Sequence, residues 1–327
     1  MPAYLDLAEG ELRARAEHAW SRLRYCTMCP RRCRVDRLAG EVGECRTGAP
    51  ARVASFGPHF GEEAPLVGRG GSGTIFFGGC NLSCVFCQNH DISQPAGDRG
   101  LTVERRAGGS TDAAPGSDRA AASRPLPGEE SPERIARMML ELQAAGCENI
   151  NFVSPSHVVP QILAALVLAA ETGLRLPLVY NSGGYDALAT LRLLDGVVDI
   201  YMPDMKYADD RVGERLSGVR DYVCRNRAAV LEMHRQVGDL ALNEHGVARR
   251  GLLVRHLVLP GELAGTVEVA RFLATEVSPG TYINVMDQYR PAHEARRHAE
   301  ISRPPTVAEY RAAVQETLAA GLWRLDG

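Results

Sequence analysis

The chain has 327 residues, of which 45% are hydrophobic, so it can bury a sizeable core as one large α/β domain or two smaller ones. Its formal net charge of −3 gives no sign of a nucleic-acid-binding surface. We find no apolar run long enough to span a membrane, and residues 1–20 form a polar, charged helix pattern without the apolar core of a signal peptide.

Cysteine usage indicates metal chemistry. Seven of the nine cysteines lie between Cys26 and Cys87, a crowding that favours metal ligands in a reducing compartment over disulfides. We therefore expect a cytoplasmic protein. The two remaining cysteines, Cys147 and Cys224, stand alone, and we expect each to be a small buried hydrophobic residue.

The first four cysteines lie within 20 residues, with Pro and Gly between them, a pattern typical of a small knuckle folded by metal. They are Cys26, Cys29, Cys33 and Cys45. Zinc would make a closed structural site, whereas a second [4Fe–4S] cluster would carry electrons or hold a substrate. The spacing leaves both open because C-x2-C pairs occur in both, and free thiols or a disulfide pair are the remaining alternative.

Four arginines interleave with these thiols, and we expect them to form a solvated face, with contact to an anionic substrate as the alternative. They are Arg31, Arg32, Arg34 and Arg37.

The next three cysteines follow an apolar run at residues 74–77, which predicts a buried strand ending in two glycines. Their spacing is Cys80-x3-Cys84-x2-Cys87, with Phe86 just before the third. Three thiolates on one short loop can hold three irons of a [4Fe–4S] cluster and leave the fourth iron open to a substrate or cofactor. A structural zinc site with His90 as fourth ligand is the alternative.

Residues 96–130 are rich in Gly, Ala, Pro, Ser and charge, with almost no large apolar residue. Such a segment buries too little surface to offset the entropy of ordering, so we expect a flexible insertion. A lid that orders with a partner is the alternative.

From residue 131 onward, helix-like and strand-like segments alternate. The pattern predicts strands at 149–153, 176–180, 197–202, 252–259 and 281–286, and helices at 132–145, 158–172, 186–194, 221–237, 266–276 and 306–321. With the strand before Cys80 this makes six β/α units, which imply a parallel sheet in an open, partial barrel. The active sites of such barrels lie at the C-terminal strand ends, where polar residues gather in this chain.

Residues 79–89 resemble the cluster loop of the radical S-adenosylmethionine (SAM) superfamily. The resemblance implies that Cys80, Cys84 and Cys87 hold a [4Fe–4S] cluster whose open iron chelates the amino and carboxylate groups of SAM, with Phe86 against the adenine. It also implies reductive cleavage of SAM to methionine and a 5′-deoxyadenosyl radical, which removes a hydrogen atom from the substrate.

Over residues 25–289, apart from the insertion, the chain is more narrowly similar to the pyruvate formate-lyase activating enzyme branch, and to its uncharacterised relatives with extra cysteines in front. This resemblance implies a glycyl radical enzyme as a protein substrate, attacked at a backbone glycine, and an electron donor such as flavodoxin or ferredoxin. A peptide or small molecule is the second enzymatic alternative. A metal-binding structural or interaction protein without enzymatic activity is the third.

The same resemblance assigns SAM-binding roles to residues at the strand ends. Where the activases have Gly-Gly-Glu-Pro, this chain has Ser154-Pro155-Ser156-His157, so the glutamate is missing and the two serines are the candidates for binding the methionine ammonium. The other SAM-binding candidates are Asn181, Asp204, Lys206, Gln288 and Tyr289. A surface ion pair remains the alternative for Asp204 and Lys206, and His157 is either a packed or capping residue or a substrate contact.

The sequence therefore predicts an α/β protein, a partial (β/α)6 radical SAM barrel with a small N-terminal cysteine-rich metal-binding module. The predicted parts are a helix and cysteine-rich module at 1–70, the barrel at 71–290 and a C-terminal loop and helix at 291–327.

Overall fold

The computed structural model describes residues 1–94 and 128–326. The expected flexible insertion at 96–130 lies outside the described residues, except for its last three positions. These form strand β3 (Gly128–Glu130), which pairs antiparallel with β1 (Ala51–His59).

Six parallel strands form the centre of the sheet, and each lies beside the next in chain order. They are β2 (Ser72–Phe77), β4 (Ile150–Val153), β5 (Leu178–Ser182), β6 (Ile200–Pro203), β8 (Ala248–Leu257) and β9 (Tyr282–Met286). The six predicted β/α units are thereby confirmed, and the C-terminal ends of all six strands meet at one edge of the sheet.

The sheet is mixed rather than purely parallel, because strands that the sequence did not predict extend it. At one edge β1 runs antiparallel to β2, and it lies within the segment predicted only as a cysteine-rich module. At the other edge β10 (Arg324–Leu325) pairs parallel with β9, inside the segment predicted as a loop and helix. The hairpin strand β7 (Ala241–Leu242) pairs with β8.

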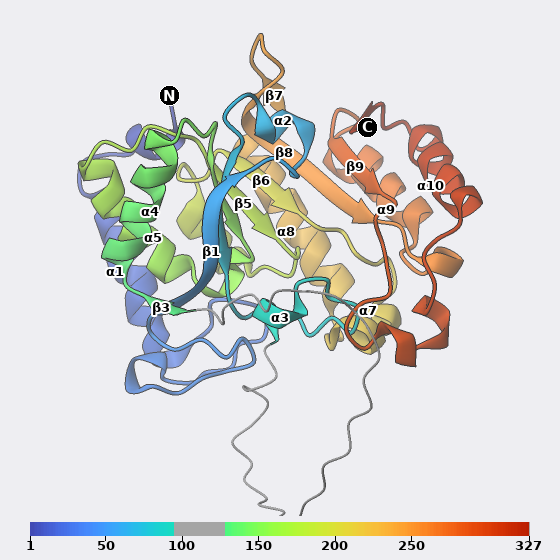
Figure 1. The fold of residues 1–327 in the computed structure, drawn as a ribbon, viewed down its shortest axis with the longest axis horizontal. Helices are drawn as coiled ribbons and strands as arrows, with labels where there is room; N and C mark the ends of the chain where they lie inside the picture. The colour runs from blue at the N-terminus through green and yellow to red at the C-terminus, as the bar shows by residue number, and fades with distance from the viewer. Residues whose placement is uncertain (95–127, 327) are drawn as a thin grey trace, which may run out of the picture.

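Helices connect the strands and cover the sheet, as Figure 1 shows. They are α1 (Glu11–Ser21), α2 (Ala64–Val67), α3 (His90–Ser93), α4 (Pro132–Ala144), α5 (Val159–Glu171), α6 (Leu188–Leu191), α7 (Asp210–Ser217), α8 (Tyr222–Val237), α9 (Thr266–Phe272) and α10 (Val307–Ala319). Six of them fall within the predicted helices, while α2, α3 and α7 were not predicted. A capping box between Thr306 and Glu309 starts α10, which fits its predicted start.

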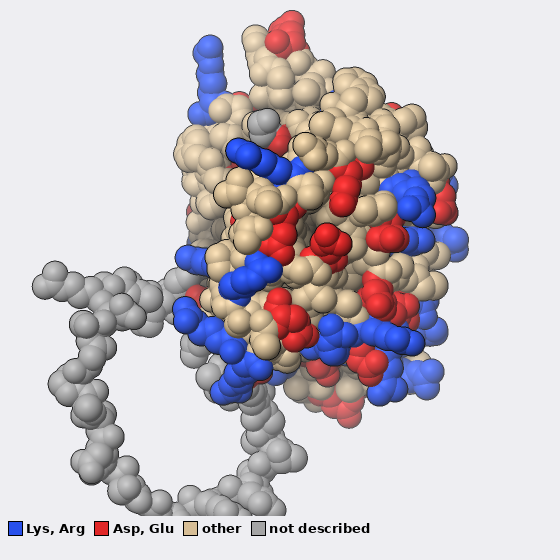
Figure 2. Space-filling model, turned by 90° about the vertical axis from the view of Figure 1, so that its right-hand side faces the viewer, with Lys and Arg blue, Asp and Glu red and all other residues tan. Residues whose placement is uncertain are grey.

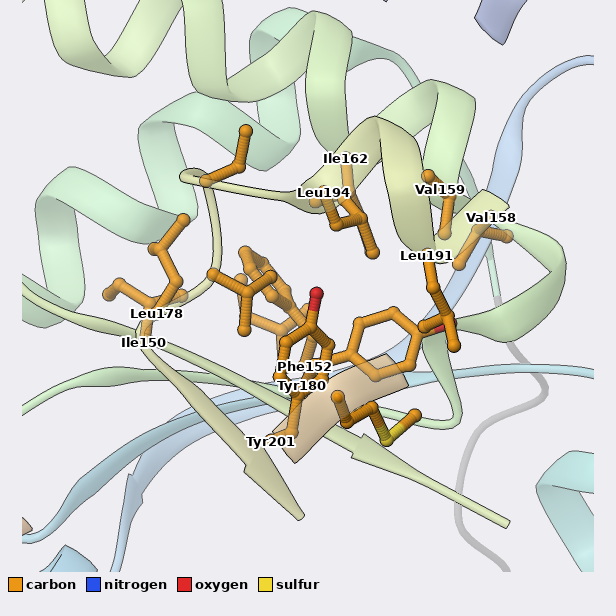
Figure 3. Close-up of a cluster of buried hydrophobic side chains, with 14 of the residues drawn as sticks. Ile150, Phe152, Val158, Val159, Ile162, Leu178, Tyr180, Leu191, Leu194 and Tyr201 are labelled. Carbon is orange, nitrogen blue, oxygen red and sulfur yellow. The ribbon is translucent and has the colours of Figure 1, made fainter. Parts of the chain in front are cut away.

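The core cluster drawn in Figure 3 packs aliphatic side chains around the rings of Phe152, Tyr180 and Tyr201. The rings of Phe152 and Phe77 lie 6.3 Å apart, and those of Tyr180 and Tyr201 meet edge to face at 5.7 Å. Both buried tyrosine hydroxyls donate hydrogen bonds, Tyr180 to Asp186 and Tyr201 to a side chain of α8. Each such ring stabilises the fold by roughly 1.5–3 kcal/mol through burial, so the strands hold their ends in fixed positions.

The surface carries mixed charge. On the face shown in Figure 2, basic and acidic side chains alternate. Among the described residues no helix is both long and apolar enough to cross a membrane.

Candidate active site

The predicted cluster loop runs from the end of β2 to α3, at the C-terminal ends of the parallel strands. Gly79 has a φ of +79°, and a Cβ atom there would lie 2.3 Å from the carbonyl oxygen of Cys45, so only glycine fits. The loop backbone is also fixed by α7, because Ser83 and Val85 donate their amides to the carbonyls of Ser217 and Leu216. The thiols therefore project from a rigid support.

The structure brings the three loop thiols together on one cavity of about 240 Å³. The amide of Leu82 donates to Cys80 Sγ at 3.4 Å. Cys84 Sγ lies 2.9 Å from the Ser217 hydroxyl, and Cys87 Sγ lies 3.2 Å from the Ser93 hydroxyl. Each sulfur thus has at least one polar neighbour, and all three cysteines line the cavity.

The residues present fit an iron–sulfur cluster. All three thiols are free rather than disulfide-bonded. Burial, and then the neighbouring Cys84, raises the pKa of Cys80 to about 12, so an electron-poor metal is needed to hold it as a thiolate. Among the described residues no group of three His, Cys, Asp or Glu side chains is placed around a single-ion position. A cubic cluster does not require its thiolates to surround a single ion, because each thiolate binds a different iron.

A buried ion network lies beside the thiols. Lys206 Nζ is 2.6 Å from one carboxylate oxygen of Asp204, and Arg255 NH2 is 2.8 Å from the other. Their side chains are only 13–21% exposed, so the surface ion pair considered from sequence is wrong. Burial alone would raise the pKa of Asp204, but the charges of Arg255 and Lys206 outweigh it and hold that pKa below its usual range.

The network continues across the barrel to Glu63, whose carboxylate lies 3.9 Å from Arg255 and accepts a hydrogen bond from Asn284 at 3.1 Å. Burial raises the pKa of Glu63 in spite of the attraction of Arg255. The Asp204 and Glu63 carboxylates therefore share Arg255, and Lys206 is the cation placed nearest the thiols.

Most of the predicted SAM-binding residues meet at this cavity. Those that line it are Cys80, Cys84, Phe86, Cys87, Ser154, Asn181, Asp204, Lys206 and Gln288. Ser154 adopts a left-handed backbone (φ 60°, ψ 51°), which is strained for serine and typical of functional sites.

Two candidates lie behind the cavity wall. Ser156 is buried and hydrogen-bonds with Asp186. Tyr289 packs its ring edge against Phe86 at 5.7 Å and donates its hydroxyl to the Ile301 carbonyl. Tyr289 is thus placed to fix Phe86. His157 is also buried, with Nε2 3.0 Å from the Gly78 carbonyl oxygen, which is the packed arrangement.

Arg255 is the site residue that the sequence reasoning missed. Its signal was a lone arginine within the apolar segment 252–259, where a charge on a buried strand needs a partner. The cavity wall also includes Gln88 and Asn89 of the cluster loop and Gly183 after β5, to which the sequence assigned no role.

The four cysteines near the N-terminus, which we call the front cysteines (Cys26, Cys29, Cys33 and Cys45), line a second, smaller cavity. Of the interleaved arginines, Arg32 and Arg34 are exposed as expected, but Arg37 is only 1% exposed, so a solvated role for it is wrong. Cys147 is buried as expected. Cys224 is exposed, because it lies on the outer face of α8.

Comparison with known proteins identifies the class. Residues 74–273 match the family model of the radical SAM superfamily, and this range includes the cluster loop and most of the barrel. The chain therefore belongs to the radical SAM superfamily and is a radical SAM enzyme.

Among curated proteins, it is 31% identical over 316 residues to the uncharacterized protein MJ0674 of Methanocaldococcus jannaschii, across 96% of this chain and 78% of that protein. Of the alternatives left open by the sequence, family membership supports an enzyme.

Solved structures show more distant likeness. A radical SAM methyltransferase from Sphaerobacter thermophilus matches 76% of this chain with a TM-score of 0.47 and 14% identity. Streptococcus suis SuiB bound to its precursor peptide SuiA matches 73% with a TM-score of 0.43 and 13% identity. The chain spans 64% and 43% of the lengths of these two proteins.

Proposed function

We propose that this radical SAM enzyme acts on a protein, and that it removes a hydrogen atom from a backbone glycine of a glycyl radical enzyme. When bound, the [4Fe–4S] cluster supplies the electron that cleaves SAM into methionine and a 5′-deoxyadenosyl radical. The observation that carries the choice of a protein substrate is the size of the cavity, taken with the resemblance to the activase branch.

Different residues of the chain bind the cluster and the different parts of SAM. Cys80, Cys84 and Cys87 hold three irons. Lys206 is positioned for the SAM carboxylate, because Asp204 is shared with Arg255 and leaves the ammonium of Lys206 partly available.

The remaining polar and aromatic groups complete the SAM site. Ser154 and Asn181 provide oxygen acceptors for the methionine ammonium in place of the missing glutamate. Phe86 lines the cavity as the ring for the adenine to pack against, and Tyr289 backs it.

The cavity supports a substrate that enters from outside. Its volume of about 240 Å³ lies below the roughly 300–1,000 Å³ of sites that enclose a drug-sized ligand. Because SAM is itself a drug-sized ligand, the described residues enclose less space than SAM and the cluster together fill, and a substrate would meet SAM at the opening of the cavity. A loop of another protein can present a single glycine at such an opening while the rest of it stays outside.

The test uses cell extract labelled with dideuterated glycine and separated by size into protein and small-molecule fractions. Each fraction is incubated anaerobically with reconstituted enzyme, SAM and reduced flavodoxin, and deuterium in 5′-deoxyadenosine is measured. We expect deuterium only with the protein fraction. Deuterium only with the small-molecule fraction would refute the proposal and favour the small-molecule alternative.

Two variants provide controls for this assay. Cys84→Ala removes one loop thiol and should abolish 5′-deoxyadenosine formation, whereas Cys147→Ala alters a buried thiol away from the site and should keep it. If Cys84→Ala retained activity, the assignment of the loop would be wrong.

A further inference from the structure

We infer that the front cysteines form a second, closed metal centre, an anionic tetrathiolate site, which fixes the loop that carries Cys80, Cys84 and Cys87. This inference is independent of the substrate proposed above. It rests on the small cavity that the thiols line, on the charge around them and on the contacts that join them to the cluster loop.

The four thiols line one small cavity although they come from separate turns. In the described residues they do not surround a single-ion position, so binding of the metal would draw them together. Backbone pairing brings the chain back on itself, with the Cys26 amide donating to the Val35 carbonyl and the Arg34 amide donating to the Cys26 carbonyl. The backbone of Arg31 hydrogen-bonds to the Cys29 sulfur, in the arrangement that stabilises metal-bound thiolates. Despite their proximity all four cysteines are free thiols.

Positively charged side chains surround the front cysteines, so an anion between them would be stabilised. Arg37 is 1% exposed, and within residues 1–94 and 128–326 its guanidinium donates only to the neutral carbonyl oxygens of Gly48 and His157. The described residues that line the cavity include Arg31, Arg32 and Arg37 but no carboxylate. A buried cation without a counter-charge costs several kcal/mol.

A tetrathiolate metal centre supplies that counter-charge. Four thiolates around a divalent zinc ion carry a net charge of about −2, and four thiolates around a [4Fe–4S]²⁺ cluster carry the same. Four neutral thiols would leave Arg37 uncompensated. Arg31 also lines this cavity, and its NH2 atom is buried without a partner among the described residues, so it too favours an anion here.

The backbone next to the front cysteines is also strained. Arg32, Arg34 and Arg46 each directly follow or flank a front cysteine and have φ values of 47°, 62° and 56°. Left-handed backbone is unfavourable at non-glycine residues and persists where the surroundings hold it. Metal–thiolate bonds are a source of stabilisation large enough to offset this cost.

The site is joined directly to the cluster loop. Arg31 Nε donates to the Asn81 carbonyl oxygen at 2.9 Å, and the Ser83 hydroxyl lies 3.3 Å from the Glu44 carboxylate. Gly79 packs against the backbone of Cys45. Cys45 is a front cysteine, and Arg31 and Glu44 lie within two residues of one in the sequence. Figure 1 shows the blue loops between α1 and β1, the stretch that contains the front cysteines, at the same end of the sheet as α3. Fixing the front thiols therefore fixes the loop.

The first experiment removes the loop thiols so that only the front site remains. A Cys80→Ala/Cys84→Ala/Cys87→Ala variant, purified anaerobically and reconstituted with iron, sulfide and zinc in separate preparations, should bind either about one zinc or about four irons with matching sulfide per chain. Adding Cys26→Ala/Cys29→Ala should abolish that binding. Either metal supports the site and identifies it, whereas equal metal in the two variants would overturn it.

The second experiment keeps every thiol. Arg37→Met removes the buried cation and should release the front metal to a chelator at least fivefold faster than wild type, whereas Arg24→Met, at an exposed arginine of the same segment that does not line the cavity, should not. Circular dichroism checks that both variants are folded. Equal release rates would refute the charge argument.

The third experiment tests the link to the cluster loop without any activity assay. In protein with intact loop thiols, Cys26→Ala/Cys29→Ala should accelerate loss of the loop cluster to a chelator severalfold, read from the decay of its visible absorbance. Cys147→Ala is the matched control. If the loop cluster were lost at the wild-type rate, the front site would not fix the loop. SAM cleavage by wild type, measured separately, distinguishes this outcome from failure of the proposed function.

Discussion

Arg255 offers the sharpest test of how the site binds SAM. We predict that Arg255→Met weakens both SAM binding and the fold. Arg255 holds one oxygen of Asp204 at 2.8 Å while Lys206 holds the other at 2.6 Å, and it is also the cation nearest Glu63. In wild type these two cations and two carboxylates sum to zero, and the variant leaves a net charge of −1.

The magnitude follows from burial and geometry. Removing one partner of a buried ion pair costs about 3–5 kcal/mol. Because these side chains remain 13–21% exposed and Lys206 still binds Asp204, we expect about 2–3 kcal/mol of lost unfolding free energy. Lys206 would then be fully engaged by Asp204, so a charge-assisted hydrogen bond to SAM worth about 1.5–3 kcal/mol is weakened. That corresponds to roughly 10- to 100-fold weaker SAM binding.

The assay is calorimetric titration of SAM into reconstituted protein, with urea denaturation for stability. Arg249→Met, at an exposed position of the same strand, is the matched control and should change neither quantity. Glu63→Gln combined with Arg255→Met restores neutrality and should recover part of the affinity. SAM affinity of Arg255→Met within twofold of wild type would refute the reasoning.

Three further predictions concern the support of the site. Tyr289→Phe should lose about 1–3 kcal/mol in urea denaturation because the buried Ile301 carbonyl loses its donor, yet keep SAM affinity because the ring still backs Phe86; loss of affinity in this variant would contradict that role. Ser154→Gly should raise the unfolding free energy by about 1 kcal/mol, because glycine relieves the strain of the left-handed backbone. Unchanged or lower stability would contradict this prediction and show that contacts of the serine side chain offset the strain. Burial lowers the pKa of His256, so unfolded protein takes up a proton that folded protein does not; stability should fall as pH drops below about 6.5, and His256→Gln should flatten that slope between pH 8 and 5.

The central strands and the cluster loop could be predicted from sequence because their signals are local. Each parallel strand is a short apolar run followed by polar residues, and the cysteine spacing is a property of one loop. Ser154, Asn181 and Lys206 were found in the same way, since parallel strands bring their C-terminal ends to one edge.

The elements that were missed depend on distant partners. Strand β1 contains Gly57 and Pro58, which weaken a strand signal, and it is held by pairing with β2 and β3. Helix α7 has only Val212 and Leu216 as buried large apolar residues, too few for a visible period. The burial of Arg37 likewise could not be predicted, because its acceptors lie at Gly48 and at His157, 120 residues away.

These missed elements explain how the cluster loop is held. Its backbone is bonded to α7 through Ser83 and Val85, to the C-terminal segment through the Glu294 amide and the Val85 carbonyl, and to the front segment through Arg31 and Asn81. A loop fixed from three sides loses little conformational entropy when it binds a cluster. Affinity for the cluster should therefore depend on residues outside the cysteine motif. Of the three supports, the segment that carries the front cysteines is the one that we propose is itself held in place by a metal.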